Sequence, residues 1–420
     1  MLTPLILAAA AAQGSFTIEA DTHWDGLGMT VWFIDDINGD GYREFGTSAF
    51  CTDLNANNSG TLYIYDGATQ TLIRRHDGIG HQARLGEYAT AVGDIDGDGF
   101  IDYAGGARNE NFAGERFGSV YVYSGLTGDL IYRLDGYQAD SDFGWYISDI
   151  GDINGDGYDD LAVGSPREDN VNGAVRFFSG KTGKLWYTAK GQIPKGHFGH
   201  CFAMAGDVDQ DGIGDIAIAA PWADKQSGQV LVYSGATFEI LERVYGTRDG
   251  ARLGARLADA RDFDGDGHLE LMVAEPCFDS VYLVDLQLGV IKRQHQGQRT
   301  PTKSGVGHAM GLCGDVDGDG YEDYLISRPG EWDWNFFVNV GPGGSVQVIS
   351  GLTGQIITQA WGEELDDGFG GSMDLKMDAA GPGQAVLLVG APAAGDLVND
   401  HAPGKVYGLY PQNWNGGTSD

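Results

Sequence analysis

Short alternating runs of apolar and polar residues, separated by Gly, Asp and Asn, follow one another along almost the whole chain. Residues 143–151, 160–166, 173–180 and 184–187 show the pattern, because each run is rich in β-branched or aromatic residues and is bounded by turn-forming residues. A period of two with this composition predicts β-strands, and no segment has a convincing helical period. We therefore expect units of four short strands.

The sequence Asp-x-Asp/Asn-x-Asp-Gly marks each copy of this unit. It begins at Asp36, Asp94, Asp152, Asp207, Asp262 and Asp315, at spacings of 58, 58, 55, 55 and 53 residues. A seventh, degenerate copy begins at Asp378. In all seven copies a glycine lies eight residues before the first aspartate, at Gly28, Gly86, Gly144, Gly199, Gly254, Gly307 and Gly370. The shared register predicts seven structural repeats.

Four-stranded units at this period are typical of β-propeller blades, which pack radially and hide most strand edges. A linear β-solenoid is the alternative, although its coils are usually shorter and need caps at both ends. The last unit stops after its third strand, residues 404–410, whereas an additional strand, residues 15–20, precedes the first unit. The prediction is an all-β, seven-bladed propeller of four-stranded antiparallel blades, closed by the N-terminal strand, which removes an open edge.

The units resemble FG-GAP repeats, the blades of integrin alpha-chain heads and of many bacterial surface proteins. Phe-Gly is kept at residues 143–144, 198–199 and 369–370 and becomes Leu-Gly or Val-Gly in the other copies, and Gly-Ala-Pro is intact at 390–392. The resemblance covers nearly the whole chain. It implies seven blades, metal loops on a lower face and ligand contacts on an upper face, but it does not imply integrin function.

Six of the seven loops offer side-chain oxygen atoms at positions 1, 3, 5 and 9, and position 7 can offer its backbone carbonyl. Hard oxygen ligands at this density suit Ca²⁺, which accepts about 6 to 8 of them, better than Mg²⁺. We therefore predict about six calcium ions, one in each of blades one to six. The predicted ligands are Asp36, Asn38, Asp40, Tyr42 and Glu44; Asp94, Asp96, Asp98, Phe100 and Asp102; Asp152, Asn154, Asp156, Tyr158 and Asp160; Asp207, Asp209, Asp211, Ile213 and Asp215; Asp262, Asp264, Asp266, His268 and Glu270; and Asp315, Asp317, Asp319, Tyr321 and Asp323.

The alternative is that these loops are merely hairpin turns, whose chemistry favours the same residue types. A turn does not require acids at positions 1 and 9, however. The seventh loop has Ala380, Pro382 and Val386 at positions 3, 5 and 9. It is therefore expected to bind no calcium.

The charge balance limits the partners. The 420 residues include 60 acidic and 26 basic side chains, a formal net charge of −34, which opposes binding to nucleic acid and to anionic lipid. A solvated acidic surface would explain this charge as well, but many of the acids lie in the six loops, and six Ca²⁺ ions would change −34 to −22. No segment past the N-terminus approaches the ~20 apolar residues of a membrane span, so we expect no membrane insertion. We also expect a monomer.

The ends of the chain carry weaker signals. Residues 2–12 form a short apolar, Ala-rich run that resembles a secretory signal, although no Lys or Arg precedes it, and an ordinary N-terminus is the alternative. We expect a signal peptide at 1–12, one propeller at 13–410 and a polar tail at 411–420, in a secreted, periplasmic or cell-surface protein. The four cysteines are widely spaced and are interpreted as mostly unpaired.

The predicted function is binding of a protein or carbohydrate ligand through upper-face loops, because these loops vary in length on a constant framework. The blade-six loop contains Trp332 and Trp334, which we predict as aromatic platforms, and Arg108, Arg167 and Arg328 could clamp carboxylate or sulfate groups. Two alternatives stay open. The aromatic residues could cover the core of their own blade, and the arginines could pair with acids such as Glu110 and Asp169.

An enzyme is the competing hypothesis, although the chain has no recognisable catalytic motif. His200, His308 and Glu87 each follow the conserved glycine of a blade. They could therefore lie at the mouth of a central channel and perform acid–base chemistry in a polysaccharide lyase or hydrolase. Ordinary polar residues at a strand start would give the same pattern.

Overall fold

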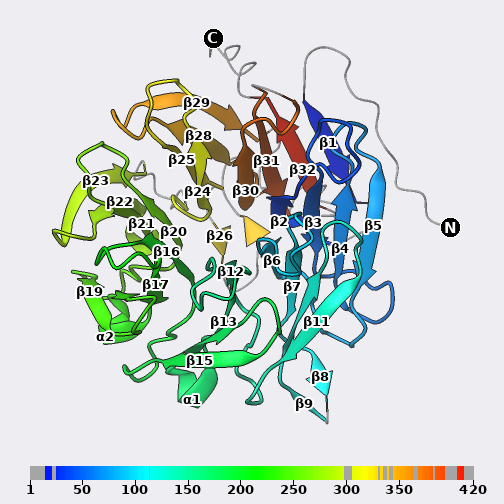
Figure 1. The fold of residues 1–420 in the computed structure, drawn as a ribbon, viewed down its shortest axis with the longest axis horizontal. Coiled ribbons are helices and arrows are strands. Elements are labelled where there is room, and N and C mark those ends of the chain that lie inside the picture. The colour runs from blue at the N-terminus through cyan, green and yellow to red at the C-terminus, as the bar shows by residue number, and fades with distance from the viewer. Residues whose placement is uncertain are drawn as a thin grey trace.

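The chain forms seven four-stranded antiparallel sheets that follow one another around a central axis in chain order (Figure 1). The computed structural model describes residues 15–20, 25–112, 114–297, 305–329, 332–333, 338–339, 344–362, 368–381, 384–392 and 404–410. The predicted seven-bladed all-β propeller is therefore confirmed.

In each blade the first strand lies nearest the axis, where most neighbouring first strands are in contact with one another. From blade one to blade seven the strands are β2 (Leu27–Phe33), β3 (Phe45–Ala49), β4 (Thr61–Tyr65), β5 (Leu72–Asp77); β6 (Tyr88–Ala91), β7 (Tyr103–Ala107), β10 (Ser119–Tyr123), β11 (Leu130–Asp135); β12 (Ile147–Asp149), β13 (Leu161–Ser165), β14 (Ala174–Phe178), β15 (Leu185–Lys190); β16 (Phe202–Gly206), β17 (Asp215–Ala220), β18 (Gln229–Tyr233), β19 (Ile240–Tyr245); β20 (Leu257–Arg261), β21 (Glu270–Glu275), β22 (Ser280–Asp285), β23 (Val290–Gln296); β24 (Met310–Gly314), β25 (Asp323–Arg328), β28 (Ser345–Ile349), β29 (Ile356–Trp361); and β30 (Ser372–Lys376), β31 (Val386–Ala391), β32 (Lys405–Leu409), β1 (Phe16–Glu19).

The last blade is completed by the N-terminal strand, as predicted. Strand β1 pairs antiparallel with β32, from Phe16 opposite Gly408 to Glu19 opposite Lys405. The ring of Phe16 also stacks on Phe45 of blade one, with ring centroids 5.3 Å apart. This strand therefore joins the two ends of the ring and covers an edge of β32 that would otherwise be open.

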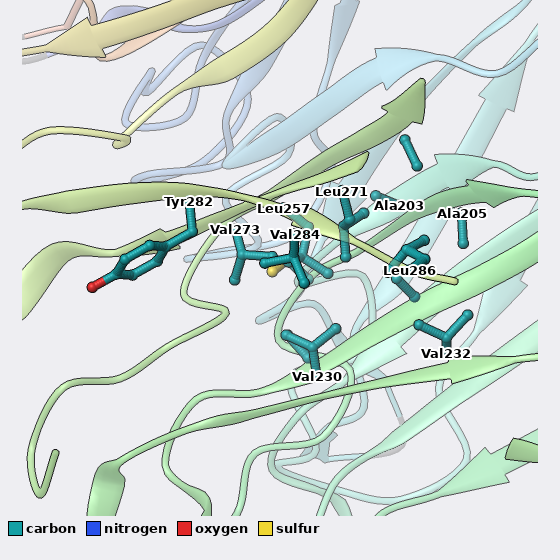
Figure 2. Packing of buried hydrophobic residues seen from close by; sticks show 14 of the residues in the cluster. Ala203, Ala205, Val230, Val232, Leu257, Leu271, Val273, Tyr282, Val284 and Leu286 are labelled. Carbon is teal, nitrogen blue, oxygen red and sulfur yellow. The ribbon is translucent and has the colours of Figure 1, made fainter. Parts of the chain in front are cut away.

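The core lies between blades. The described residues contain seven apolar clusters, each shared by two adjacent blades. Figure 2 shows the cluster between blades four and five, where Val230 and Val232 of β18 face Leu271 and Val273 of β21. Apolar burial contributes about 25 cal/mol per Å². Because the buried apolar clusters lie between blades, each blade is stabilised mainly by packing against its two neighbours.

The glycine that lies eight residues before the first aspartate of each repeat is required for steric reasons, as Gly28 shows. Gly28 has a φ of +87°, and a β-carbon at this position would clash with the backbone oxygen of Lys405. The left-handed conformation and the close approach both require glycine. The glycine landmark in the sequence thus reports how one blade packs against the next.

Short elements lie outside the blades. Helical turns follow the second strand of blades three, four and five, as α1 (Glu168–Val171), α2 (Ala223–Gln226) and η1 (Pro276–Phe278). Two small hairpins extend the loops of blades two and six, β8 (Asn111–Phe112) with β9 (Glu115–Arg116) and β26 (Trp332–Asp333) with β27 (Val338–Asn339). All four cysteines are free, as interpreted from the sequence.

Candidate functional site

The Asp-rich loops of blades one to six connect the first strand of each blade to the second, so they share one face of the disc, which we call the lower face. The aspartates shape these loops through side-chain hydrogen bonds to the backbone. In all six loops the aspartate at position 1 accepts a hydrogen bond from the glycine N–H at position 6, at 2.8 to 3.0 Å. These contacts hold each loop in a tight turn before any ion binds.

Three acidic side chains converge in four of the loops. Carboxylate oxygens from positions 1, 3 and 9 all lie within 4.8 Å of one another in blades two, four, five and six. The groups are Asp94, Asp96 and Asp102; Asp207, Asp209 and Asp215; Asp262, Asp264 and Glu270; and Asp315, Asp317 and Asp323. All donors in these four groups are oxygen atoms, and this donor set fits calcium. Blade five holds a further group, in which a ring nitrogen of His268 lies with carboxylate oxygens of Asp266 and Asp285.

Blades one and three replace the third-position acid by asparagine. The Asn38 Nδ2 donates to Glu44 Oε1 at 2.8 Å, and the Asn154 Nδ2 donates to Asp160 Oδ1 at 2.6 Å. Positions 3 and 9 therefore lie together in these loops as well. Positions 3 and 9 thus lie together in all six blades, and position 1 joins them within 4.8 Å in four. The full ligand sets stay a prediction.

The ligand role of position 7 stays a prediction. In each loop the N–H of this residue donates to the position-5 aspartate, at 2.8 to 3.2 Å. This contact explains why the side chain itself can vary, since only its backbone takes part. The residues are Tyr42, Phe100, Tyr158, Ile213, His268 and Tyr321.

The ninth-position carboxylates are buried, with at most 1% of each residue exposed. Burial is the main cause that raises the pKa of Glu44, Asp102 and Glu270 to about 7 and that of Asp160 to about 6. Neighbouring acids raise these pKa values further. Two carboxylates about 4 Å apart repel by ~4 kcal/mol at an effective dielectric constant of 20, so a bound divalent cation would relieve a substantial cost.

The seventh loop lacks this arrangement. Ala380 and Val386 are buried apolar residues at positions 3 and 9, and Pro382 lies outside the described residues. The backbone N–H of Ala380 instead donates to the Gln384 carbonyl at 3.2 Å. The described residues of this loop therefore offer an internal comparison for the six acidic loops.

The opposite, upper face holds a row of adjoining rings that are tilted by 46° and 58° to one another, and the sequence analysis singled out only His200 among these rings. The first strands run from this face to the lower loops, so residues just before them lie here. Trp145 is 5.2 Å from the His200 ring, and His200 is 4.9 Å from the Trp222 ring. Two guanidinium groups lie at the ends of the row, Arg108 at 4.7 Å from the Trp145 centroid and Arg252 at 5.1 Å from Trp222. We call these five residues the aromatic row.

The three candidate arginines have different environments. Arg108 is 12% exposed and forms a bidentate ion pair with Glu87, at 2.6 and 2.5 Å, with Asp142 at 3.4 Å. Arg167 is half exposed and lies 3.8 Å from Asp142. Burial lowers the pKa of Arg328, whose Nε has no hydrogen-bond partner among the described residues.

Glu110 and Asp169, which the sequence suggested as partners of the three arginines, interact with other residues. Glu110 accepts a hydrogen bond from Tyr121 at 2.8 Å and lies 3.7 Å from Arg133, while Asp169 pairs with Lys190 at 3.0 Å. The pairing alternative thus holds for Arg108, with Glu87 and Asp142 as its partners, and for Arg167, with Asp142. Of the predicted platforms, Trp332 is described only by its backbone in β26, and Trp334 lies outside the described residues.

The catalytic candidates do not form one acid–base group. His200 is 4% exposed, and burial holds its pKa well below the usual value. Burial also lowers the pKa of His308 to about 3, and its Nδ1 lies 3.0 Å from the Gly371 carbonyl. Glu87 is occupied by Arg108. His308 and Glu87 line a central cavity of about 810 Å³ together with the inner strands.

Comparisons with known proteins agree with this architecture. Residues 144–178 and 202–233 match the FG-GAP repeat family. The chain is 28% identical over 243 residues to integrin alpha-4 of Xenopus laevis, covering 54% of this chain and 23% of that protein. It is 32% identical over 216 residues to integrin alpha-V of Gallus gallus, covering 47% and 20%, and 34% identical over 206 residues to integrin alpha-IIb of Homo sapiens, covering 44% and 19%.

These alignments span only about a fifth of the length of the relatives. Within the described residues, no helix is both long enough and apolar enough to cross a membrane. The likeness therefore concerns the propeller, and the activities of the whole relatives do not follow from it.

Proposed function

Because this chain is an FG-GAP repeat protein with distant homology to integrin alpha chains, we propose that it is an extracellular, calcium-stabilised binding module. Its lower-face loops bind calcium, and its upper face binds a protein or carbohydrate ligand. The aromatic row is the observation that carries the ligand-binding part of this proposal.

The calcium part is supported by chemistry and by repetition. Six loops share one donor pattern, and each buries a ninth-position carboxylate beside other acids. Extracellular calcium modules bind with Kd values of roughly 10⁻⁴ to 10⁻³ M, so the ions would be bound outside the cell and lost from a calcium-poor cytosol. The extracellular location itself is supported by the likeness to integrin alpha chains.

The aromatic row suits recognition on the upper face. Trp145 and Trp222 are half-buried, so each keeps part of a flat, rigid apolar surface available to a sugar face or a protein side chain. Arg167, which lies 3.8 Å from Asp142, is half exposed, and a guanidinium group suits planar oxyanions. The surface can thus bind groups that the net charge of the molecule would repel.

A glycan array and a panel of extracellular proteins, probed with the whole protein in calcium, would test this assignment. We expect the double change Trp145→Ala and Trp222→Ala to abolish binding of the ligand so found. Trp361→Ala is the matched control, because Trp361 lies at the end of the fourth strand of blade six and is 63% exposed. Binding that survives in the double variant would contradict the assignment.

The same assay distinguishes the competing sites. Loss of binding only on Trp332→Ala with Trp334→Ala would place the ligand at the blade-six loop. Polysaccharide turnover that disappears on His200→Ala would favour the enzyme. A monomer is expected in sedimentation, since the chain closes its own ring and its seventh blade needs no strand from a second copy.

A further inference from the structure

The blade-five loop differs from the others because a lysine lies among its acids. The Lys292 Nζ is 3.3 Å from Asp264 Oδ2, 3.5 Å from Asp285 Oδ2 and 3.9 Å from Glu270 Oε1, and it hydrogen-bonds to Asp266. Its side chain is only 22% exposed. Three of the four side chains predicted to bind calcium in this loop therefore contact one ammonium group.

The position of Lys292 is apolar in the other five blades that have an acidic loop. Lys292 is the extra, unpaired residue of a β-bulge in the fourth strand, β23. The residues on either side of it, Ile291 and Arg293, pair with two consecutive residues of the third strand, β22. The same bulge occurs in blades one, two, three, four and six, where the extra residues are Ile73, Ile131, Trp186, Leu241 and Ile357. The position therefore does not need a charge for folding.

A second change accompanies the lysine. In blades two, three, four and six a glycine N–H after the third strand donates to the ninth-position carboxylate. Blade five has Leu286 at this place, and its N–H donates to the Leu269 carbonyl at 2.9 Å instead. The Glu270 Oε1 has no hydrogen-bond partner among the described residues and lies near the Lys292 Nζ. The Lys292 ammonium group thus provides a positively charged neighbour for the Glu270 carboxylate, which lacks the glycine N–H donor of the other blades.

We propose that Lys292 is a tethered cation that takes the place of calcium in the blade-five loop. The loop then keeps its shape without the metal and binds no calcium at concentrations that fill the other loops. For an ion to enter, Lys292 would have to leave Asp264 and Asp266, because two positive charges at ligand distance repel. The inference rests on the proposed calcium role of the remaining loops.

Native mass spectrometry of the calcium-loaded protein tests the ion count. We expect Lys292→Met to bind one calcium ion more than the wild type. Asp262→Asn should remove this extra ion from the Lys292→Met protein and leave the wild-type count unchanged. Lys181→Met is the matched control, because the Lys181 Nζ lies over the Tyr158 ring beside the blade-three loop, 4.4 Å from its centroid.

Thermal melting in a chelator gives a second, metal-free readout. Lys292→Met should melt at a lower temperature than the wild type and Lys181→Met, because the blade-five acids lose their counterion. Calcium should remove this difference, because the extra ion replaces the ammonium group. Equal, non-zero ion counts in all three proteins, or equal melting in chelator, would overturn the inference alone. A complete lack of bound calcium would overturn the proposed calcium role and this inference with it.

Discussion

Single aspartates in the acidic loops perform two tasks. Asp94 accepts hydrogen bonds from the Gly97 and Gly99 N–H groups, at 2.7 and 3.0 Å, and offers oxygens that lie near those of Asp96 and Asp102. The hydrogen bonds stabilise the turn, whereas the shared negative charge destabilises it until a cation binds. Substitutions that separate shape from charge can therefore distinguish a calcium loop from a simple turn.

Asp94→Asn and Asp94→Ala should differ in this way. The asparagine keeps one of the two hydrogen bonds and removes a charge, so in chelator it should melt close to the wild-type temperature. The alanine also loses the hydrogen bonds, each worth about 1 kcal/mol, and should melt lower. In calcium both should fall below the wild type, since one site at 100 times its Kd contributes ~2.7 kcal/mol. A simple turn would show the same order with and without calcium.

Two half-buried histidines should make the protein sensitive to acid. His76 Nε2 lies 2.7 Å from the Tyr103 hydroxyl, and His295 Nε2 lies 2.7 Å from the Tyr324 hydroxyl, each in the next blade. Burial lowers the pKa of both histidines from 6.5 to about 4. The unfolded chain therefore binds more protons between these pH values, and stability is lost as the pH falls from about 6.5 to about 4.

Melting temperatures in saturating calcium at pH 7.5 and pH 5 check this point. His76→Gln with His295→Gln should show a smaller decrease between the two pH values than the wild type. Calcium loss in acid affects both proteins equally, so the difference isolates the histidines. The same decrease in both proteins would mean that the imidazoles do not lose protons on folding.

At the scale of elements, local signals predicted most of the architecture. The alternation and turn residues of 143–187 correspond to β12 to β15, and the unassigned strand before the first repeat became β1. The helical turns α1 and α2 could not be predicted, because four residues cannot show a period of 3.6. The six acidic loops were recognisable because each ligand set lies within nine residues of sequence.

The upper face was less predictable because its residues come from separate blades. Trp145, His200 and Trp222 are distant in sequence, and only the packing of blades three and four brings their rings together. Trp145 and His200 do share one signal, since each directly follows a conserved glycine. Lys292 was missed for a similar reason, because the fourth strand reaches the loop only after the sheet has formed.

Ring closure by β1 should contribute measurably to stability. Phe16 is half-buried against Phe45 of blade one, whereas its neighbour Thr17 is exposed. Phe16→Ala should therefore destabilise the protein by about 1 to 3 kcal/mol, below the range for a fully buried ring. Thr17→Ala should change stability by less than about 0.5 kcal/mol. Chemical denaturation of both variants in calcium measures the difference.

Removal of Ser15–Ala20 is the stronger form of this test. The deletion exposes β32 as an unpaired edge strand, and such edges promote association between chains. Aggregation should follow, and light scattering would detect it. A soluble, monomeric deletion variant with unchanged melting would mean that β1 does not close the ring.

For the whole molecule, the important fact is where the negative charge lies. The acidic loops all lie at the lower ends of the inner strands, so much of the formal charge of −34 is concentrated on one face of the disc. With Lys292 in place of one ion, five calcium ions would change −34 to −24. Electrostatic repulsion among the loops should thus limit stability when calcium is removed.

Salt provides the corresponding test. In chelator, the melting temperature should rise between 0.05 and 1 M NaCl, because the Debye length falls to about 3 Å at 1 M salt and the loop carboxylates are screened from one another. In saturating calcium the carboxylates are already neutralised, so the same change of salt should have a much smaller effect. KCl serves as the control for specific binding of sodium. A salt effect of equal size in both conditions, or a melting curve that chelation leaves unmoved, would contradict calcium as the counterion of the lower face.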